Sequence, residues 1–553
     1  MNGLLLLLPA IPLLLSIGAL SGKLQARGVL LTVGSTGALA GVLAILPPED
    51  LEAGWLLLGA TLGLDATGRA LLGAAAILWP VATMAARELF TGESGPRFAM
   101  CFLLTLAGNL GVLVSQDAAT FYLSFAVMTF AAYGLVVHDG TAEAVRAGRI
   151  YLILSIAGEA LLLSGLFLLA AQVGNPVAAE TAEIYGEIHH PGLIGALLLA
   201  GFAVKMGVVP LHVWLPLAHP AAPPPASAIL SGLLVKGGLL GWLRFLPEGD
   251  PALTVPGDTL AALGLAAAFL TALVGCFQER AKTVLAYSTV SQMGLLSVLA
   301  GLLIAGRGEA EILLPAIALF ALHHALVKGA LFLAVAHLKD FRPLFLAATT
   351  LAVLALAGAP LTSGLVAKGA VKASLTGSLS LLVTFTSLTT TLLLLRFLAL
   401  AWPRRDTARR PGITAGAGAW LLLVAASQAL PWLAAEPAHR AYALQAGSLW
   451  DSLWPLLLAG ALALVAWRLL RPWWRLPEGD LVIPAEWLVL AGYRTLVDAI
   501  AACVYPLRRR QDRRPPWRAF ARMLNDREAD VPWVGVQLLA LVLLLPLLYL
   551  LAI

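Results

Sequence analysis

Charged residues are scarce in this chain. Only 12% of its 553 residues are Asp, Glu, Lys or Arg, and 60% are hydrophobic, whereas roughly a quarter of an ordinary soluble domain is charged. This composition excludes the usual soluble globular class. The formal net charge of +5 is therefore no indication of nucleic-acid binding, because the positions of the few basic residues matter more than their total.

Cysteine and nucleotide-binding motifs are equally scarce. The three cysteines are far apart and form no C-x-x-C pair, so we expect apolar fillers and neither disulfides nor iron–sulfur ligands. There is no Walker-type phosphate loop and no G-x-G-x-x-G after a strand. His323 and His324 adjoin, so they point to different sides of a helix and cannot both face one haem iron. We expect no catalytic residue, cofactor or metal in this chain.

Long apolar runs are what the chain does have. Stretches of about 20 apolar residues recur from end to end, and each is long enough to cross a bilayer as a helix. The sequence therefore predicts an all-α polytopic membrane protein with about 14–16 transmembrane helices. The first run, residues 3–20, is not followed by a small-residue cleavage site, so we expect a retained helix and no signal peptide.

The distribution of basic residues predicts the orientation in the membrane. Loops on alternate sides are basic, and those between them are acidic or neutral, as at 47–54, 178–187 and 247–258. The basic positions are Lys23 and Arg27, Arg87 and Arg97, Arg146 and Arg149, Arg280 and Lys282, Lys339 and Arg342, and Arg404, Arg405, Arg409 and Arg410. Basic loops remain cytoplasmic. We therefore expect both termini on the periplasmic side of a bacterial cytoplasmic (inner) membrane.

Two parts of the chain, residues 97–247 and 253–402, each contain an apolar helix interrupted by proline. Pro210 interrupts the first and Pro360 the second. Proline removes a backbone donor, and such breaks persist in a membrane only when they are buried in protein or line a wet cavity. Paired interrupted helices are typical of inverted-repeat transporters. We predict two such repeats, preceded by transmembrane helices in 1–96 and followed by others in 403–470.

Four lysines lie within apolar runs: Lys205, Lys236, Lys328 and Lys368. A lysine at the bilayer centre costs about 2.5–3.5 kcal/mol on insertion scales, so together they would cost on the order of 10 kcal/mol. Lys328 and Lys368 are near enough to helix ends to reach an interface by snorkelling. Lys236 lies about 20 Å along its helix. We predict a water-accessible ionic role for Lys236.

Histidines accompany these lysines. His324 and Lys328 are four residues apart in "LHHALVKGALFL" (322–333), so they share a helix face and can exchange a proton through one water. The alternative is a buried core histidine beside a snorkelling lysine. His219, in a proline-rich bend, and His323 are candidate gates, although a turn histidine facing water also fits His219.

At these residues the chain resembles the antiporter-like subunits of respiratory complex I, Mrp-type sodium/proton antiporters and membrane-bound hydrogenases. The resemblance lies in residues 201–238, "AKTVLAYSTVSQMG" (281–294), "HHALVKGALFL" (323–333) and "GAPLTSGLVAK" (358–368). It implies a fourteen-helix core with two inverted five-helix repeats, each containing a broken helix. It also implies a proton pathway in the middle of the membrane, coupled to the chemistry of partner subunits. The matching positions are Lys205, Lys236, His324, Lys328 and Lys368.

One position departs from the family pattern. The family usually places a glutamate in its fifth helix as the ion-pair partner of the first broken-helix lysine. The matching run here is "FYLSFAVMTF" (121–130), with Ala126 at that position. We hypothesise that Glu159, in the next helix, supplies the missing carboxylate to Lys205. An equally open alternative is that Glu159 pairs with a partner subunit or a backbone group.

The C-terminal region differs in character. Residues 471–530 are rich in Trp, Arg and Pro, and we expect this basic segment to contact anionic lipid headgroups. Within it, 485–505 reads as an amphipathic helix lying on the membrane, with a true crossing as the alternative. Residues 531–553 then form a last transmembrane helix. Near the other end, Asp65 and Arg69 are one turn apart, which predicts a structural ion pair.

Three functions remain open. The first is a proton- or cation-translocating membrane subunit of a multisubunit complex, possessing no redox or nucleotide site of its own but belonging to an NADH:quinone oxidoreductase-like or hydrogenase-like translocase. The second is the same fold as the proton-driven membrane subunit of an inorganic-carbon uptake complex. The third is a non-conducting scaffold, which Ala126 makes worth testing. Lysine and histidine nitrogens suit protons better than sodium.

Overall fold

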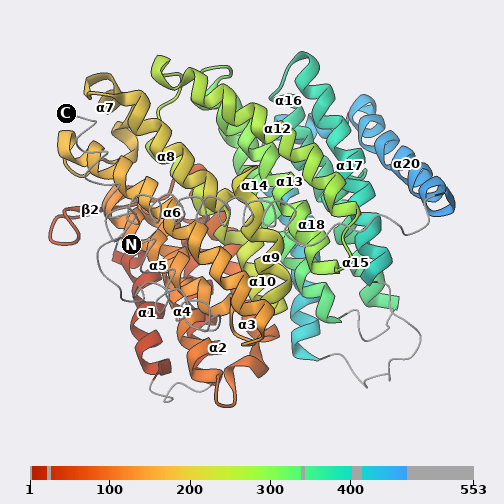
Figure 1. Ribbon diagram of the computed structural model, residues 1–553, viewed down its shortest axis with the longest axis horizontal. Helices are drawn as coiled ribbons and strands as arrows, with labels where there is room; N and C mark the ends of the chain where they lie inside the picture. The colour runs from red at the N-terminus through yellow and green to blue at the C-terminus, as the bar shows by residue number, and fades with distance from the viewer. Residues whose placement is uncertain (1–2, 21–25, 338–342, 402–413, 470–553) are drawn as a thin grey trace, which may run out of the picture. The chain divides into compact units, whose positions relative to one another are not determined.

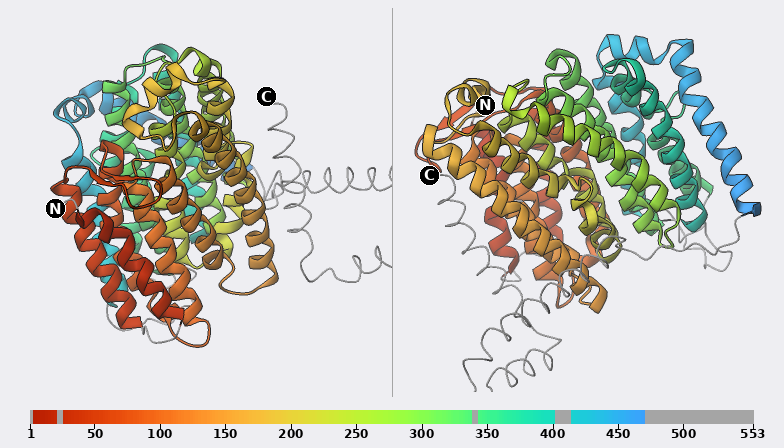
Figure 2. Two further views of the ribbon diagram at one scale, coloured as in Figure 1. Left: turned by 90° about the vertical axis from the view of Figure 1, so that its left-hand side faces the viewer. Right: turned by 45° about the horizontal axis from the view of Figure 1, so that its top comes forward.

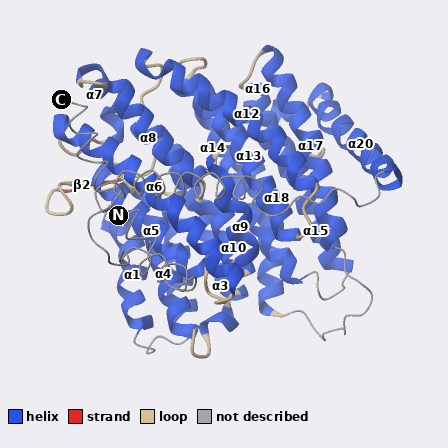
Figure 3. Cartoon of the chain, in the orientation of Figure 1, coloured by secondary structure: helices blue, strands red, loops and turns tan. Residues whose placement is uncertain are grey.

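Most residues that the structure describes are helical. The structure is a computed structural model that describes residues 3–20, 26–337, 343–401 and 414–469, and Figure 3 shows helices throughout these ranges. Thirteen segments in them are long and apolar enough to cross a membrane, and α1 (Gly3–Leu20) and α15 (Pro343–Ala357) are shorter apolar helices. The prediction of an all-α polytopic fold is confirmed. The predictions for 471–530, 485–505 and 531–553 fall outside the described residues.

The thirteen spanning segments contain most of the helices. They are α2 (Ala26–Ile45), α3 (Ala66–Ala85), α4 (Gly95–Val114), α5 (Ala118–Val136), α6 (Ala142–Val173), α8 (Pro191–Met206) with η3 (Leu211–Val213) and α9 (Trp214–Ala221), α10 (Pro224–Ile229) with η4 (Leu230–Leu234) and α11 (Lys236–Phe245), η5 (Pro251–Leu253) with α12 (Thr254–Cys276), α13 (Ala281–Ile304), α14 (Ala310–His337), α17 (Gly377–Ala401), α18 (Ala415–Ala434) and α20 (Ala446–Leu469).

The remaining elements are short. They are the 3-10 turns η1 (Arg87–Phe90) and η2 (Ala178–Glu180), the helices α7 (Thr181–Glu187), α16 (Ser363–Ala373) and α19 (Pro437–Ala443), and a hairpin in which β1 (Leu51–Ala53) pairs antiparallel with β2 (Ala60–Leu62).

α14 occupies the middle of the bundle. It packs against α3, α10, α13, α15, α16 and α18. Figure 1 shows α14 among other helices, whereas α20, in blue, lies at an outer edge in Figures 1 and 2. A helix that is apolar on all sides is expected at such a position. The polar side chains in the middle of α14, those of His323, His324 and Lys328, are buried and therefore face other helices.

Glycines allow α12 and α13 to pack backbone to backbone. Gly264 faces Gly294, and Gly257 faces Gly301, about two turns away along each helix. A Cβ built on Gly294 would lie 2.5 Å from the carbonyl oxygen of Gly264. Small residues at helix contacts are the usual way for apolar helices to approach closely inside a membrane.

The first broken helix is interrupted at Pro210. α8 ends at Met206, Gly207 adopts a left-handed conformation with φ 71°, and α9 begins at Trp214. A helix end leaves carbonyl groups without a backbone donor. The indole Nε1 of Trp214 donates to the carbonyl of Val204 at 2.8 Å. One carbonyl at this end of α8 is thus satisfied by a side chain of the following half-helix.

The second broken helix, α15–α16, is built in a similar way around Pro360. α15 ends at Ala357, and Gly358 (φ 90°) and Leu361 (φ 64°) both take positive φ before α16 begins. Lys368 Nζ, on α16, donates to the carbonyl of Ala357 at 3.1 Å. In this break the side chain that satisfies the helix end is one of the four lysines.

A third irregularity was not predicted. Between α10 and α11 the chain makes a π-helical turn, η4, and after Val235 the helix α11 begins with Lys236. π-turns inside α-helices are rare and frequently mark functional sites. The lysine expected deep in a regular helix therefore sits at a distortion of that helix.

The predicted pair of Asp65 with Arg69 is wrong. Asp65 instead forms an ion pair with Arg244 at the end of α11, with 2.6 Å between Oδ2 and Nη2. Arg69 donates to the carbonyl of Ala44. Asp65 precedes α3 and accepts from the backbone of Gly68, so its side chain faces back toward the helix N-terminus and away from the next turn. Local spacing was overridden by a contact distant in sequence.

Candidate proton-transfer site

All four intramembrane lysines are buried. Lys236 and Lys328 are 0% exposed, Lys205 is 4% exposed and Lys368 is 5% exposed. Each side-chain nitrogen is hydrogen-bonded to groups inside the protein. Snorkelling of Lys328 and Lys368 toward an interface is therefore not what the structure shows. Because an unpaired buried charge is costly, the partners of these nitrogens are what keep them tolerable.

The central contact joins Lys236 to His324. Lys236 Nζ lies 2.6 Å from His324 Nδ1 and donates to the carbonyl of Ser231 at 2.7 Å. Ser231 lies in η4, so the π-turn places an acceptor beside the lysine. The two nitrogens come from α11 and α14. In a direct hydrogen bond between two bases, either nitrogen can hold the shared proton.

Lys328 points to a different helix from the one expected. Its Nζ donates to Ser288 Oγ at 2.6 Å and to the carbonyl of Leu285, both on α13. His324 is not among its hydrogen-bond partners in the described residues. As the sequence predicts, His324 and Lys328 lie on one face of α14. Their side chains nevertheless contact different helices, α11 for His324 and α13 for Lys328.

Hydroxyl groups of η4 and α13 link the surroundings of Lys236 to those of Lys328. Ser231 Oγ lies 2.8 Å from Thr289 Oγ1, and Thr289 Oγ1 donates to the carbonyl of Leu285 at 3.0 Å. This carbonyl also accepts from Lys328. A continuous set of polar contacts therefore runs from the residue that holds Lys236 to the residue that holds Lys328.

On the side of the second broken helix, the histidine that makes the contact is His323 and not His324. His323 Nδ1 lies 3.1 Å from the hydroxyl of Ser363, the first residue of α16. Lys368, on the same helix, donates to Ser387 Oγ on α17 at 3.2 Å. Because adjacent residues on a helix face different sides, His324 serves the lysine of α11 and His323 contacts the helix that bears Lys368.

Lys205 lies in a separate polar group. Its Nζ donates to Thr129 Oγ1 at 3.0 Å and to the hydroxyl of Tyr151 at 3.3 Å, and Tyr151 itself donates to the carbonyl of Thr129. The ring of Phe125 lies 5.6 Å from the same nitrogen, within cation–π range. No direct contact between Lys205 and Lys236 occurs among the hydrogen bonds of the described residues.

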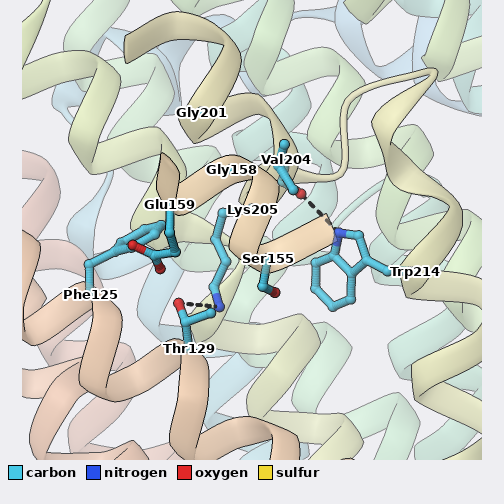
Figure 4. A pocket seen from close by; sticks show the side chains of 9 residues that line it. All are labelled: Phe125, Thr129, Ser155, Gly158, Glu159, Gly201, Val204, Lys205 and Trp214. Carbon is cyan, nitrogen blue, oxygen red and sulfur yellow. Dashed lines mark hydrogen bonds between the residues drawn. The ribbon is translucent and has the colours of Figure 1, made fainter. Parts of the chain in front are cut away.

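Glu159 lines a small cavity together with Lys205 (Figure 4). The carboxylate is buried, with 6% exposure, and its oxygens have no hydrogen-bond partner among the described residues. The cavity has a volume of about 10 Å³, which is close to the space that one water needs. The Glu159 carboxylate thus lines the same cavity as Lys205 but forms no direct ion pair with the lysine.

His219 is not a water-facing turn residue. It lies in α9, is 0% exposed, and stacks on Phe332 with ring centroids 4.6 Å apart. Neither ring nitrogen has a hydrogen-bond partner in the part of the chain that the structure describes. Phe332 also lies 5.1 Å from Lys328 Nζ. The position proposed as a gate therefore adjoins the lysine of α14 through an aromatic ring.

Sequence reasoning missed an ion pair next to Lys368. Lys372, one turn further along α16, lies 2.6 Å from Asp451 of α20, and their side chains are 11% and 43% exposed. It also missed the hydroxyls of Ser231, Thr289 and Ser288. Serine and threonine are ordinary in apolar helices because their hydroxyls bond to their own backbone, so no sequence signal separates the bridging ones from the rest.

The described residues contain no group of three or more His, Cys, Asp or Glu side chains that could hold a metal ion. Cys101 and Cys276 are free and partly buried. Cys503 lies outside the described ranges. The site is therefore built from amines, imidazoles, hydroxyls and one carboxylate, a set suited to carrying protons.

Curated proteins named as a component or subunit of larger enzymes are similar in sequence. Hydrogenase-4 component B of Escherichia coli (strain K12) is 31% identical, over 44% of this chain and 38% of that protein. NADH-quinone oxidoreductase subunit N of Herminiimonas arsenicoxydans is 28% identical, over 52% of this chain and 63% of that protein. The chain thus spans less than two thirds of the length of these relatives.

Solved structures share the fold. A chain of the Mrp complex from Dietzia sp. DQ12-45-1b matches with a TM-score of 0.73 at 21% identity, over 92% of this chain and 60% of that chain. A chain of the membrane-bound sulfane sulfur reductase, an archaeal respiratory membrane complex, matches with a TM-score of 0.69 at 20% identity, over 84% and 99%. Both are parts of multisubunit membrane complexes.

The family described as NADH:quinone oxidoreductase/Mrp antiporter, transmembrane, matches residues 115–393. This range contains both broken helices and all four buried lysines. The resemblance inferred from the motifs is confirmed. The chain belongs to the NADH:quinone oxidoreductase/Mrp antiporter transmembrane family, as an antiporter-like membrane subunit.

Proposed function

We propose that this chain is the proton-translocating subunit of a multisubunit membrane complex, and that protons move along its buried lysines and histidines. The 2.6 Å contact between Lys236 Nζ and His324 Nδ1 is the observation that supports this most directly. Desolvation penalises two neighbouring positive charges severely. A pair of bases in direct contact will therefore hold one proton between them and pass it on when a neighbour changes charge.

In the first half, Glu159 and Lys205 form the initial exchange site. The cavity that they line has room for about one water, which can bridge the carboxylate to the amine. Glu159 thereby takes the role that Ala126 cannot fill. His219 gates the route from the side of α9, where its buried ring adjoins Phe332 and, through it, Lys328.

In the second half, the route continues through His323 and Lys368. His323 contacts Ser363 at the start of α16, and Lys368 lies five residues further along that helix. Lys372 and Asp451 follow one turn later, where Asp451 is 43% exposed. We assign this half-exposed pair to proton exchange with the aqueous phase, on the face opposite the basic loops.

Partner subunits supply the driving reaction. The solved relatives are chains of an Mrp complex and of a sulfane sulfur reductase complex, and the curated relatives are named for hydrogenase-4 and NADH-quinone oxidoreductase. In our proposal this chain works in such an assembly in a bacterial cytoplasmic membrane, with its basic loops inside. Sodium is the alternative cation, and an inorganic-carbon uptake complex is the alternative partner.

The test is transport by the assembled complex with Lys236→Met. Methionine has a similar length and removes a buried charge, so assembly should be unimpaired. We expect co-purification of all partners with proton transport into vesicles reduced to background. Arg307→Gln, at an exposed ion pair with Asp258, is the matched control and should transport normally. A scaffold would behave in the opposite way: Lys236→Met would impair assembly or change nothing.

The ion and the partner are identified in the same preparation. Proton uptake that is unchanged when sodium is replaced by choline supports the proton as the ion carried, whereas proton uptake that disappears shows that sodium is carried in exchange for it. Mass spectrometry of the co-purified subunits distinguishes redox partners from an inorganic-carbon enzyme. Neither result depends on the Lys236 variant.

A further inference from the structure

A large groove outside the lysine–histidine site opens between α2, α3, α14, α18 and α19. Its volume is about 590 Å³. The wall is mostly apolar and contains small residues, among them Gly73 and Ala318. A Cβ on Gly73 would meet only the methyl group of Ala44, at 3.9 Å, so this part of the wall is open. The groove is large enough for part of a ligand of lipid size.

The polar residues that line the groove are close to helix ends, and apolar lining residues lie deeper along the helices. Arg69, Glu436 and His439 line the groove and are near the beginnings of α3 and α19. Leu322 belongs to the apolar part; it is twelve residues into α14, about 18 Å from the start of that helix. This gradient matches a molecule with a charged head and a long hydrocarbon tail.

The polar end has unused bonding capacity. Nδ1 of His439 is buried and has no hydrogen-bond partner in the described part of the chain. Arg69 uses Nε for the carbonyl of Ala44 at 2.7 Å; within the described ranges its terminal N–H groups make no hydrogen bond, so they can donate to a ligand. Glu436 precedes α19 without capping it and is exposed. The groove end therefore offers a cation, an anion and an imidazole.

We propose that this groove binds one phosphatidylethanolamine molecule. Its phosphate would pair with Arg69, its ammonium group with Glu436, and an acyl chain would lie past Gly73 toward Leu322. A purely anionic lipid would leave its headgroup facing the Glu436 carboxylate, and a choline headgroup has no N–H to donate. A zwitterionic headgroup with a primary amine satisfies both charges. This proposal is independent of proton transfer.

The test is lipid retention by the intact complex. The complex is purified in mild detergent, depleted of bulk lipid, and incubated with equal amounts of phosphatidylethanolamine, phosphatidylglycerol and phosphatidylcholine; the lipid retained is then extracted and counted by mass spectrometry. We expect one phosphatidylethanolamine per chain and about tenfold preference over phosphatidylglycerol, the equivalent of one charge-assisted hydrogen bond. Glu436→Gln should abolish this preference, and Arg69→Gln should weaken the binding of both phosphatidylethanolamine and phosphatidylglycerol.

Gly73→Leu fills the groove and should remove the retained lipid whatever its headgroup. Glu309→Gln, an exposed acid just before α14 that does not line the groove, is the control and should retain lipid like the wild type. Melting temperatures show which variants fold. The proposal is overturned if retention is unchanged in Glu436→Gln and Arg69→Gln, if the wild type shows no headgroup preference, or if cross-linking finds a peptide segment in the groove.

Discussion

Lys236 and His324, 88 residues apart in the chain, are joined by a hydrogen bond of 2.6 Å between two side-chain nitrogens. Both residues are 0% exposed. If both nitrogens were protonated, two positive charges would repel each other strongly at this distance in a low-dielectric interior. The pair thus accommodates one proton, and its occupancy should respond to charge on the neighbouring Lys328. The predictions below follow from this contact and from the groups around it.

Thr289→Val should slow proton transport without affecting assembly. The change removes the hydroxyl that joins Ser231 to the carbonyl of Leu285 and preserves the side-chain shape. We expect about a tenfold loss in rate, the equivalent of one hydrogen bond. Ser297→Ala, on the same helix with its hydroxyl bonded to its own backbone, is the control. Equal rates for both variants would show that the hydroxyl bridge is not used.

Glu159→Gln and Lys205→Met should have non-additive effects on transport. Both residues line one cavity, so removing either disables the same exchange step, and the double variant should be little worse than the worse single variant. Transport rates of the wild type, both single variants and the double variant give the coupling directly. Independent effects that multiply would end the assignment of Glu159 as the partner of Lys205.

The pair of Asp65 with Arg244 should give an acid-dependent stability. Burial raises the pKa of the Asp65 carboxyl, but the charge of Arg244 and hydrogen bonds from Gly68 and Arg244 outweigh burial and hold that pKa below its ordinary value of 3.8. The carboxylate therefore stabilises the fold fully above about pH 3.8. This contribution is lost as the pH falls through the lower pKa of the folded state.

Asp65→Asn tests this effect in melting experiments between pH 7 and pH 3. We expect a loss on the order of 1 kcal/mol at pH 7, because the carboxylate is 37% exposed and solvent screens the pair. The difference from the wild type should shrink at the acid end. Asp258→Asn, which breaks an exposed pair with Arg307, should cost less. A gap that stays constant across the pH range would contradict the assignment.

Gly294→Ala should destabilise the bundle. The new methyl group would collide with the backbone of α12 at Gly264, and overpacking of this kind costs about 1–3 kcal/mol. Gly418→Ala is the control, since a Cβ there meets nothing within 4 Å and alanine favours the helix. Thermal unfolding in detergent should show a lower midpoint for Gly294→Ala alone. Two equally stable variants would mean that α12 and α13 separate readily.

The helical class and the two interrupted helices could be predicted because composition and proline act locally. Runs of apolar residues need a membrane or a protein interior. A proline inside a helix removes a backbone hydrogen bond, although α14 runs through Pro315 without a break, so proline marks a candidate break and neighbouring glycines such as Gly207 and Gly358 complete it. The buried lysines were evident for the same reason, since lysine in an apolar run is expensive. Each of these signals is present in a short stretch of sequence.

Pairing between helices could not be predicted. Nothing near Lys236 indicates His324 as its partner, and nothing near Lys328 indicates that it turns toward α13. Asp65 joined Arg244 instead of the nearer Arg69, because tertiary packing decides among charges that helical spacing treats alike. The π-turn before Lys236 has no residue signature. The same limit applies to Lys372 and Asp451, which are 79 residues apart.

The most direct measurement is the initial rate of proton uptake by vesicles containing the complex with Lys236→Met, His324→Gln, or both. If the two nitrogens pass one proton, each single change should reduce the rate roughly 100-fold, as loss of a proton-transfer group does, and the double variant should be no slower than either. Losses that multiply, or a single variant that transports normally, would contradict the account.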